Sequence, residues 1–111
     1  MTFKTQYGSY EGAEFNAARY GNGNLALAVE SATEGQICIC SVNPGQKVDD
    51  GLLAVKDYSE NEGMASTLLD MGIIGKKKYS IPSGWVSIPV YELTEKGLAL
   101  WGLNKGTERK G

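Results

Sequence analysis

The sequence of 111 residues contains no histidine, and it has only two cysteines and three prolines. Without histidine the chain has no Ser–His–Asp or Cys–His catalytic arrangement, and it lacks the side chain most often used for proton transfer. The same absence removes the usual nitrogen ligand of zinc sites, which two cysteines alone do not replace. The sequence therefore predicts a non-enzymatic protein with no metal site and no cofactor.

Long apolar runs and a strong excess of one charge are also absent. No stretch approaches the roughly 20 apolar residues that cross a bilayer, and Met1 to Gln6 lack the basic and then apolar order of a signal peptide. Thirteen acidic and eleven basic residues give a net charge of −2, which offers little general attraction to nucleic acid or to an anionic membrane. We expect a cytoplasmic protein that does not bind membranes.

The two cysteines, Cys38 and Cys40, stand two residues apart in a β-rich run over 36–43. On a strand they share one face, at a separation near the outer limit for a disulfide. No basic residue lies within the run to favour a thiolate. The pattern predicts two reduced, small side chains that face the core.

The first half of the chain has the alternation of half-buried strands. Leu25, Leu27 and Val29 alternate with small or charged residues. The Gly-Asn-Gly-Asn segment over 21–24 is typical of a hairpin turn, because glycine and asparagine tolerate positive φ. These patterns predict an antiparallel meander of three strands over 13–20, 25–30 and 36–43.

In the second half, an apolar strand over 52–57 precedes a segment with helical spacing. Its apolar residues fall on one side of a helix that Gly72 would end, and Ser59 and Glu62 have the spacing of a capping box at its start. Further strands are predicted over 73–81 and 85–92. Pro89 would place the latter at a sheet edge or at a bulge, because proline donates no ladder hydrogen bond.

These elements predict an α+β fold. We expect a single small domain over 1–104, a mostly antiparallel sheet of five or six strands with one amphipathic helix, about 59–72, packed on one face. Residues 94–104 fit a short helix or an added strand, and 105–111 have the composition of a flexible polar tail. The pattern leaves open whether Trp85, Tyr91 and Trp101 belong to the core or to an interface.

Four motifs together resemble one family of small domains with no established activity. They are Tyr-Gly-Asn-Gly-Asn over 20–24, Val42-Asn43, Lys-Asp-Tyr-Ser-Glu-Asn-Glu-Gly over 56–63, and Ser-Gly-Trp-Val-Ser-Ile-Pro-Val over 83–90. The family is encoded by phages, plasmids and conjugative elements of Gram-positive and gut bacteria, and the resemblance covers residues 13–93. It implies an accessory protein of mobile DNA in a bacterial host cell, a setting rich in inhibitors of host defence.

The loop over 56–63 is the first candidate for partner binding, since loops between a strand and a helix often carry function. A helix start accounts for Ser59, Glu60 and Glu62 through capping and the helix dipole. It does not account for the other motif residues, although Gly63 fits a close approach of another backbone. The predicted partner-binding residues are Asp57, Tyr58, Glu60, Asn61, Glu62 and Gly63, which with Asp49 and Asp50 form an acidic group.

The sequence thus favours a non-enzymatic protein-binding module of a mobile element, an inhibitor of a host defence nuclease of the anti-CRISPR or anti-restriction type. Its partner would be a host or mobile-element protein, and both monomer and homodimer are open. One alternative is a small-ligand protein with an anion site at the helix start near Ser59. The other is a nucleic-acid-binding accessory protein that uses Lys76, Lys77, Lys78, Tyr79 and Trp85.

Overall fold

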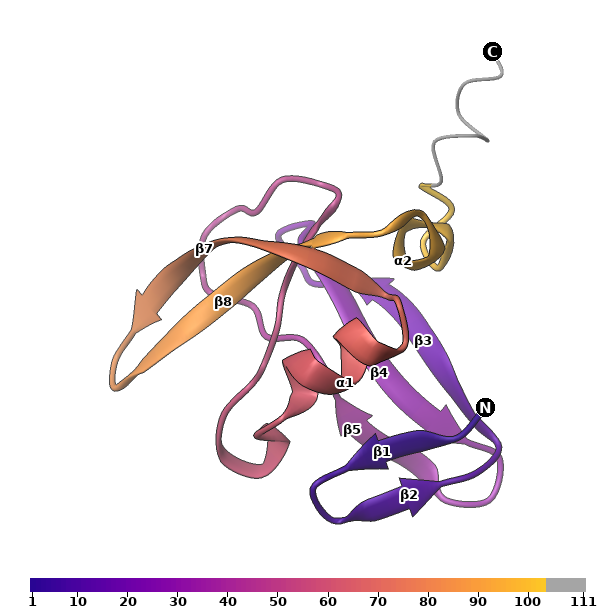
Figure 1. Ribbon diagram of the computed structural model, residues 1–111. Helices are drawn as coiled ribbons and strands as arrows, with labels where there is room; N and C mark the ends of the chain where they lie inside the picture. Colours follow the sequence, from indigo (N-terminus) through magenta and orange to yellow (C-terminus); the bar gives the residue numbers. More distant parts are fainter. Residues whose placement is uncertain (104–111) are drawn as a thin grey trace.

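The computed structural model describes residues 1–103, in which short antiparallel strands make up most of the regular structure (Figure 1). An N-terminal hairpin consists of β1 (Phe3–Thr5) and β2 (Gly8–Tyr10). The second sheet is a meander of β3 (Ala13–Arg19), β4 (Leu25–Ser31) and β5 (Gly35–Ile39). The third sheet has the order β6-β8-β7 and consists of β6 (Leu52–Ala54), β7 (Ile74–Ser83) and β8 (Val86–Leu93).

The expected α+β class with mostly antiparallel strands is confirmed, and the predicted meander is found as β3, β4 and β5. The expected single sheet is replaced by several small ones, because the eight strands among the described residues fall into three sheets. The segment after β5 changes its pairing partner: Cys40 N donates to Leu27 O, whereas Val42 N donates to Ala54 O. The predicted strand over 36–43 therefore ends one sheet and turns toward the next.

The N-terminal hairpin is an element that the sequence patterns miss. Its strands have three residues each, which is too short for alternation to indicate a strand. Long-range contacts hold it in place: Phe3 is fully buried and lies edge-on to Phe15, with ring centroids 5.9 Å apart. Packing, rather than local pattern, thus determines this element.

The expected helix over 59–72 is divided into two pieces. Ser59–Asn61 form a 3-10 helix, η1, and Met64–Asp70 form α1. Gly63 lies between them with φ at +92°, and a right-handed helix cannot continue through that backbone conformation. The backbone conformation of Gly63 therefore explains why the single expected helix is divided.

Residues after β8 form a second helix, α2 (Glu95–Ala99), which decides between the two predicted forms of this segment. Thr94 caps it, because its Oγ1 accepts a hydrogen bond from Gly97 N at 3.0 Å. Beyond α2, Trp101 donates from Nε1 to Ala18 O at 2.7 Å. The predicted polar tail over 105–111 lies outside the described residues. No helix in the described part of the chain is long and apolar enough to cross a membrane.

Two apolar clusters stabilise the domain. The main cluster joins the inner face of the β3–β5 sheet to Phe3, α1 and the start of β7, and Leu68 and Leu27 are almost completely buried in it. Tyr91 and Trp101 are partly buried against this cluster, so they contribute to the core. The second cluster lies under the β7–β8 hairpin and consists of Val48, Ala54, Ile81, Ile88 and Val90.

The position of Pro89 corrects the expectation of an edge strand, because β8 is the central strand of its sheet. Its carbonyl accepts from Val55 N at 3.0 Å, just beyond the end of β6. The N of Pro89 faces this same side, so the ladder bond that proline cannot donate is the one to Val55, just past the end of β6, and the pairing of β8 with β7 is unaffected. Ile88 and Val90, on the face of this strand opposite to Pro89, are buried.

Candidate functional site

The loop over 56–63 has structural contacts that its sequence does not reveal. The predicted capping box is wrong: η1 and α1 have no side-chain cap from their own first residues. Asp57 performs this function instead, because its Oδ1 accepts from Ala65 N at 3.0 Å. A carboxylate from outside the helix thus bonds one of the free amides at the start of α1. The same contact places a negative charge where the alternative hypothesis expects an anion.

Three further motif residues also contribute to the fold. Asn61 is 6% exposed, and its Nδ2 donates to Ile39 O at the outer edge of β5. Tyr58 packs partly against the second cluster. A Cβ at Gly63 would have nothing within 4 Å, so its positive φ explains this glycine, and the expected close approach of a backbone is absent. The part of these residues in partner binding stays a prediction.

Replacing Asp57 with alanine is expected to lower the free energy of unfolding by about 1 kcal/mol, because a helix amide loses its acceptor. Asp57→Asn keeps an oxygen acceptor and should lose less. Chemical denaturation of the two variants and the wild type measures the difference. Equal stability of Asp57→Ala and wild type would show that this capping contact contributes nothing.

Two motifs of the family resemblance meet in a cluster of asparagines. Asn43, at the end of Val42-Asn43, accepts at Oδ1 from Asn22 Nδ2 and Asn24 Nδ2, both at 3.2 Å. Asn24 is 3% exposed; its Nδ2 also donates to Gln46 O at 2.8 Å, and its Oδ1 accepts from Val48 N at 2.7 Å. This cluster fixes the long connection between β5 and β6, which the separate motifs did not predict.

Three members of the predicted acidic group have different surroundings. Asp50 pairs with Arg19 at the end of β3, with Oδ1 and Nη1 3.0 Å apart, and this hydrogen bond lowers the pKa of Asp50. Asp57 bonds the helix amide, and Glu62 is exposed beside the N-terminal hairpin. Asp50 and Asp57 therefore have partners within the fold, whereas Glu62 faces solvent.

A pocket of about 380 Å³ opens between the N-terminal hairpin, β5 and the start of α1, and we call it the hairpin pocket. It brings part of the 56–63 loop, Asn61 to Gly63, next to residues of the hairpin and to Cys38. Gln6 Nε2 donates to Ser59 O at 3.0 Å and closes the gap between hairpin and η1. The volume of the hairpin pocket lies at the lower end of the range for small-molecule sites.

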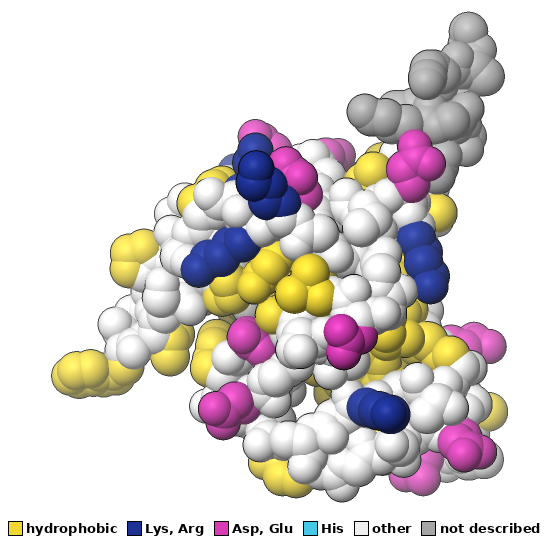
Figure 2. Space-filling view, viewed as in Figure 1, with side chains coloured by type: hydrophobic (Ala, Val, Ile, Leu, Met, Phe, Trp, Pro, Cys, Tyr) yellow, Lys and Arg dark blue, Asp and Glu magenta, His cyan; other side chains and the backbone are white. Residues whose placement is uncertain are grey.

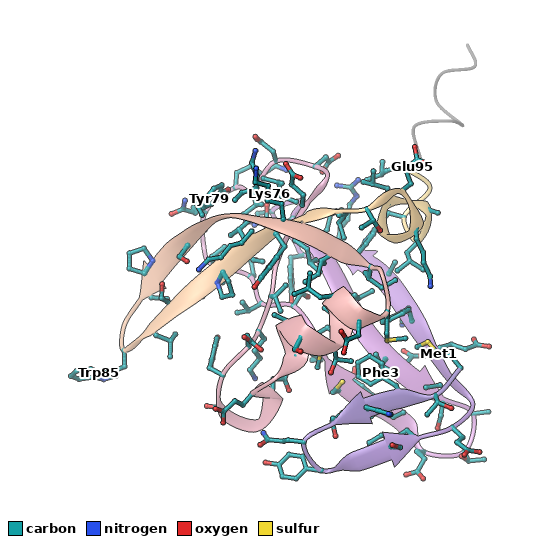
Figure 3. The ribbon with its side chains drawn as sticks, viewed as in Figure 1. Met1, Phe3, Lys76, Tyr79, Trp85 and Glu95 are labelled. Carbon is teal, nitrogen blue, oxygen red and sulfur yellow. The ribbon has the colours of Figure 1, made fainter. Side chains whose placement is uncertain are left out.

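The lysine run of the nucleic-acid hypothesis lies on β7, an edge strand of its sheet. Lys76, Lys77 and Lys78 are exposed, and Lys78 pairs with Glu92 at 3.3 Å. Two register shifts occur at Lys77, and bulges and lysines on an edge also protect it from further strand pairing. Lys76 lies near the base of the β7–β8 hairpin and Trp85 at its far end (Figure 3), so they are not brought together.

Trp85 lies at the tip of the β7–β8 hairpin and is 102% exposed. Ser83 pairs with Val86, which leaves Gly84 and Trp85 as a two-residue turn. Gly84 has φ at +60°, as the first central residue of a type II′ turn requires. The hairpin projects from the body of the protein, with apolar atoms at its end (Figure 2). Trp85, which the sequence pattern left open between core and interface, is thus outside the core of the free chain.

A scan against protein-family models and searches of curated proteins and of solved structures found no match to this chain. The resemblance to the mobile-element family is therefore an expectation from the four motifs alone. Among the described residues, no group of three or more acidic or cysteine side chains could hold a metal ion.

Proposed function

We propose that this chain is a non-enzymatic protein-binding module, and that Trp85 at the tip of the β7–β8 hairpin is the anchor of its contact surface. The observation that supports the proposal is the complete exposure of this tryptophan. Tryptophan is strongly enriched among the residues that dominate binding energy. A two-residue hairpin turn that presents such a side chain favours insertion into an apolar pocket of a partner.

The energetics favour an interface role for Trp85 over a folding role. Full burial of a large apolar side chain stabilises a protein by about 1.5–3 kcal/mol, and Trp85 gains none of this in the free chain. The strands beside it need no tryptophan, because Ile81 and Ile88 already supply the apolar contacts of the hairpin. Burial of Trp85 in a complex would supply this stabilisation at the moment of binding.

The class of partner that we propose is a host defence nuclease, and the chain would act as its inhibitor. The support is the four-motif resemblance to domains encoded by mobile DNA. Glu60 and Glu62, with the other residues of the 56–63 loop, would form a second contact region in which carboxylates meet a basic nucleic-acid channel. Electrostatic complementarity of this kind contributes to the association rate more than to affinity.

Replacing Trp85 with alanine is expected to weaken partner binding at least tenfold, which corresponds to about 1.4 kcal/mol. A tagged wild-type protein first captures the partner from host extract, and the purified partner is then titrated with each variant. Trp85→Phe should retain part of the affinity. Thermal unfolding of Trp85→Ala should match the wild type, because this side chain has no folding contact to lose.

The matched control is Leu69→Ala, since Leu69 is an exposed large apolar side chain of α1, at 42% exposure, away from both proposed contact regions. It should bind within twofold of the wild type. The double variant Glu60→Gln, Glu62→Gln tests the acidic contact without removing the Asp57 cap. Equal binding by Trp85→Ala and wild type would overturn the proposal, and retention of nucleic acid in a low-salt gel shift would support the nucleic-acid hypothesis instead.

A further inference from the structure

The β7–β8 hairpin extends beyond the strand that flanks it on one side (Figure 1). Ala54 is the last residue of β6 and pairs with Val90, and Val55 N adds one more bond, to Pro89 O. Toward the tip, no further strand of residues 1–103 pairs with this side of β8, whereas its pairing with β7 continues to the turn. We call this side of β8 over 85–88 the open edge.

The open edge presents the backbone groups of Ser87. In an antiparallel strand the N–H and C=O of one residue point to the same side, and successive residues alternate between the two sides. Pro89 O faces β6, so the N–H and C=O of Ser87, two residues earlier, face the same side. Val86 and Ile88 face β7 instead. Ser87 is exposed, and its backbone groups therefore point outward from the described sheet.

The two edges of this hairpin differ in their protection against strand pairing. The outer edge of β7 has the lysine run over 76–78, two register shifts and Pro82, which are features that hinder pairing with another chain. The open edge, Trp-Val-Ser-Ile over 85–88, has no charged residue, no proline and no bulge. An unprotected edge of this kind is a template for a further strand.

We propose that the protein partner of this chain adds an extended segment to the open edge, in line with β6. The segment would accept a hydrogen bond from Ser87 N and donate one to Ser87 O, as peptides do when they bind an exposed sheet edge. Its side chains beside Val86 and Ile88 would be apolar, because both residues belong to the second apolar cluster. The inference rests on the proposed function, since Trp85 lies at the end of the same edge.

A second copy of this chain does not suit the open edge. Antiparallel pairing of two such edges about Ser87 would place Trp85 of one copy opposite Pro89 of the other. Val55 already lies opposite Pro89, as its hydrogen bond to the Pro89 carbonyl shows. The occupant that we infer is therefore a segment of another protein, which leaves the sheet before it reaches Val55.

Ser87→Pro tests the proposal, because it removes the donor of the open edge and places a ring where the segment would lie. Ser80→Pro is the matched control, since Ser80 is an exposed serine of β7 that faces the opposite edge of the hairpin. The probe is a phage-displayed library of random linear peptides, and those selected on the wild-type protein are titrated with each variant. We expect Ser87→Pro to weaken their binding about tenfold or more, and Ser80→Pro to bind as the wild type does.

Amide hydrogen exchange in the wild-type protein gives a second measurement, which decides the matter even where Ser87→Pro does not fold. In the free protein the Ser87 amide should exchange fast, whereas the Ile88 amide, which faces β7, should exchange slowly. A bound peptide should slow the exchange of Ser87. Unchanged Ser87 exchange on binding, or a selection without any peptide that prefers the wild type to Ser87→Pro, would overturn the proposal.

The partner captured with the wild-type protein separates this inference from the proposed function. Weaker binding by Trp85→Ala but not by Ser87→Pro would keep Trp85 as the anchor and overturn the added strand. Weaker binding by Ser87→Pro alone would support the added strand and overturn the anchor. Full binding by both variants would overturn both.

Discussion

Gly97→Ala is expected to lower the free energy of unfolding by roughly 3 kcal/mol, as overpacking of a close contact does. A Cβ at Gly97 would lie 2.2 Å from Ile73 O and 3.0 Å from a methyl carbon of Leu93. The carbonyl cannot move away easily, because Thr94 N donates to it at 3.1 Å and Thr94 Oγ1 at 3.2 Å. The substitution should therefore shift α2 away from β7 and β8.

Helix propensity alone predicts the opposite sign for this variant, since alanine is better than glycine in a helix by about 1 kcal/mol. The two expectations are distinguished by denaturant unfolding, or by a melting temperature that falls about 4–8 °C for each kcal/mol. Gly21→Ala is the matched control, because its Cβ would meet nothing within 4 Å and its φ is not positive. It should unfold within about 0.5 kcal/mol of the wild type. Equal stability of the two variants would contradict the close packing of α2.

Asn24→Ala is the second variant with a large expected effect, a loss of roughly 3 kcal/mol in the free energy of unfolding. The substitution leaves the buried Val48 N–H without its acceptor, which costs about 1–3 kcal/mol, and it also removes the donor of the part-buried bond to Gln46 O. The loop between β5 and β6 should loosen, since both contacts fix it to the start of β4.

Hydrogen exchange of the Val48 amide provides a local measurement, which should be fast in Asn24→Ala and slow in the wild type. Asn22→Ala is the control, because Asn22 belongs to the same cluster but is exposed. It should cost less than 1 kcal/mol. An unchanged Val48 exchange rate in Asn24→Ala would show that other contacts hold this loop.

The motif residues show which structural features a sequence pattern can predict and which it cannot. Spacing correctly predicted the hairpin turn over 21–24, because positive φ is a local property of glycine and is visible in a short segment. It assigned the helix cap to Ser59, although Asp57 bonds Ala65 N eight residues away. A side chain can bond any amide that the fold brings near it, so local spacing offers only the nearest of several caps.

For the candidate sites too, the sequence predicts single residues but not the sites that distant segments form together. Sequence patterns singled out Trp85 and Glu62 as candidate binding residues, and both are exposed on the surface of the fold. It did not predict the hairpin pocket, whose walls come from residues 4–10, 37–38 and 61–67. No periodicity connects these segments, since they meet through tertiary contacts such as the packing of Phe3 and the hydrogen bonds from Gln6 to Ser59 O and from Thr67 Oγ1 to Lys4 O.

The sequence by itself determined the class of the fold and the chemistry that the chain lacks. Alternation in β4 and β8 requires one apolar and one polar face, whatever the partner strand is, and histidine chemistry is excluded by composition. The tertiary structure alone decided the division into three sheets, the position of Cys38 in a pocket, and the exposure of Trp85. These features depend on contacts between residues far apart in the chain. They are stabilised only when those segments pack together, so no local segment can predict them.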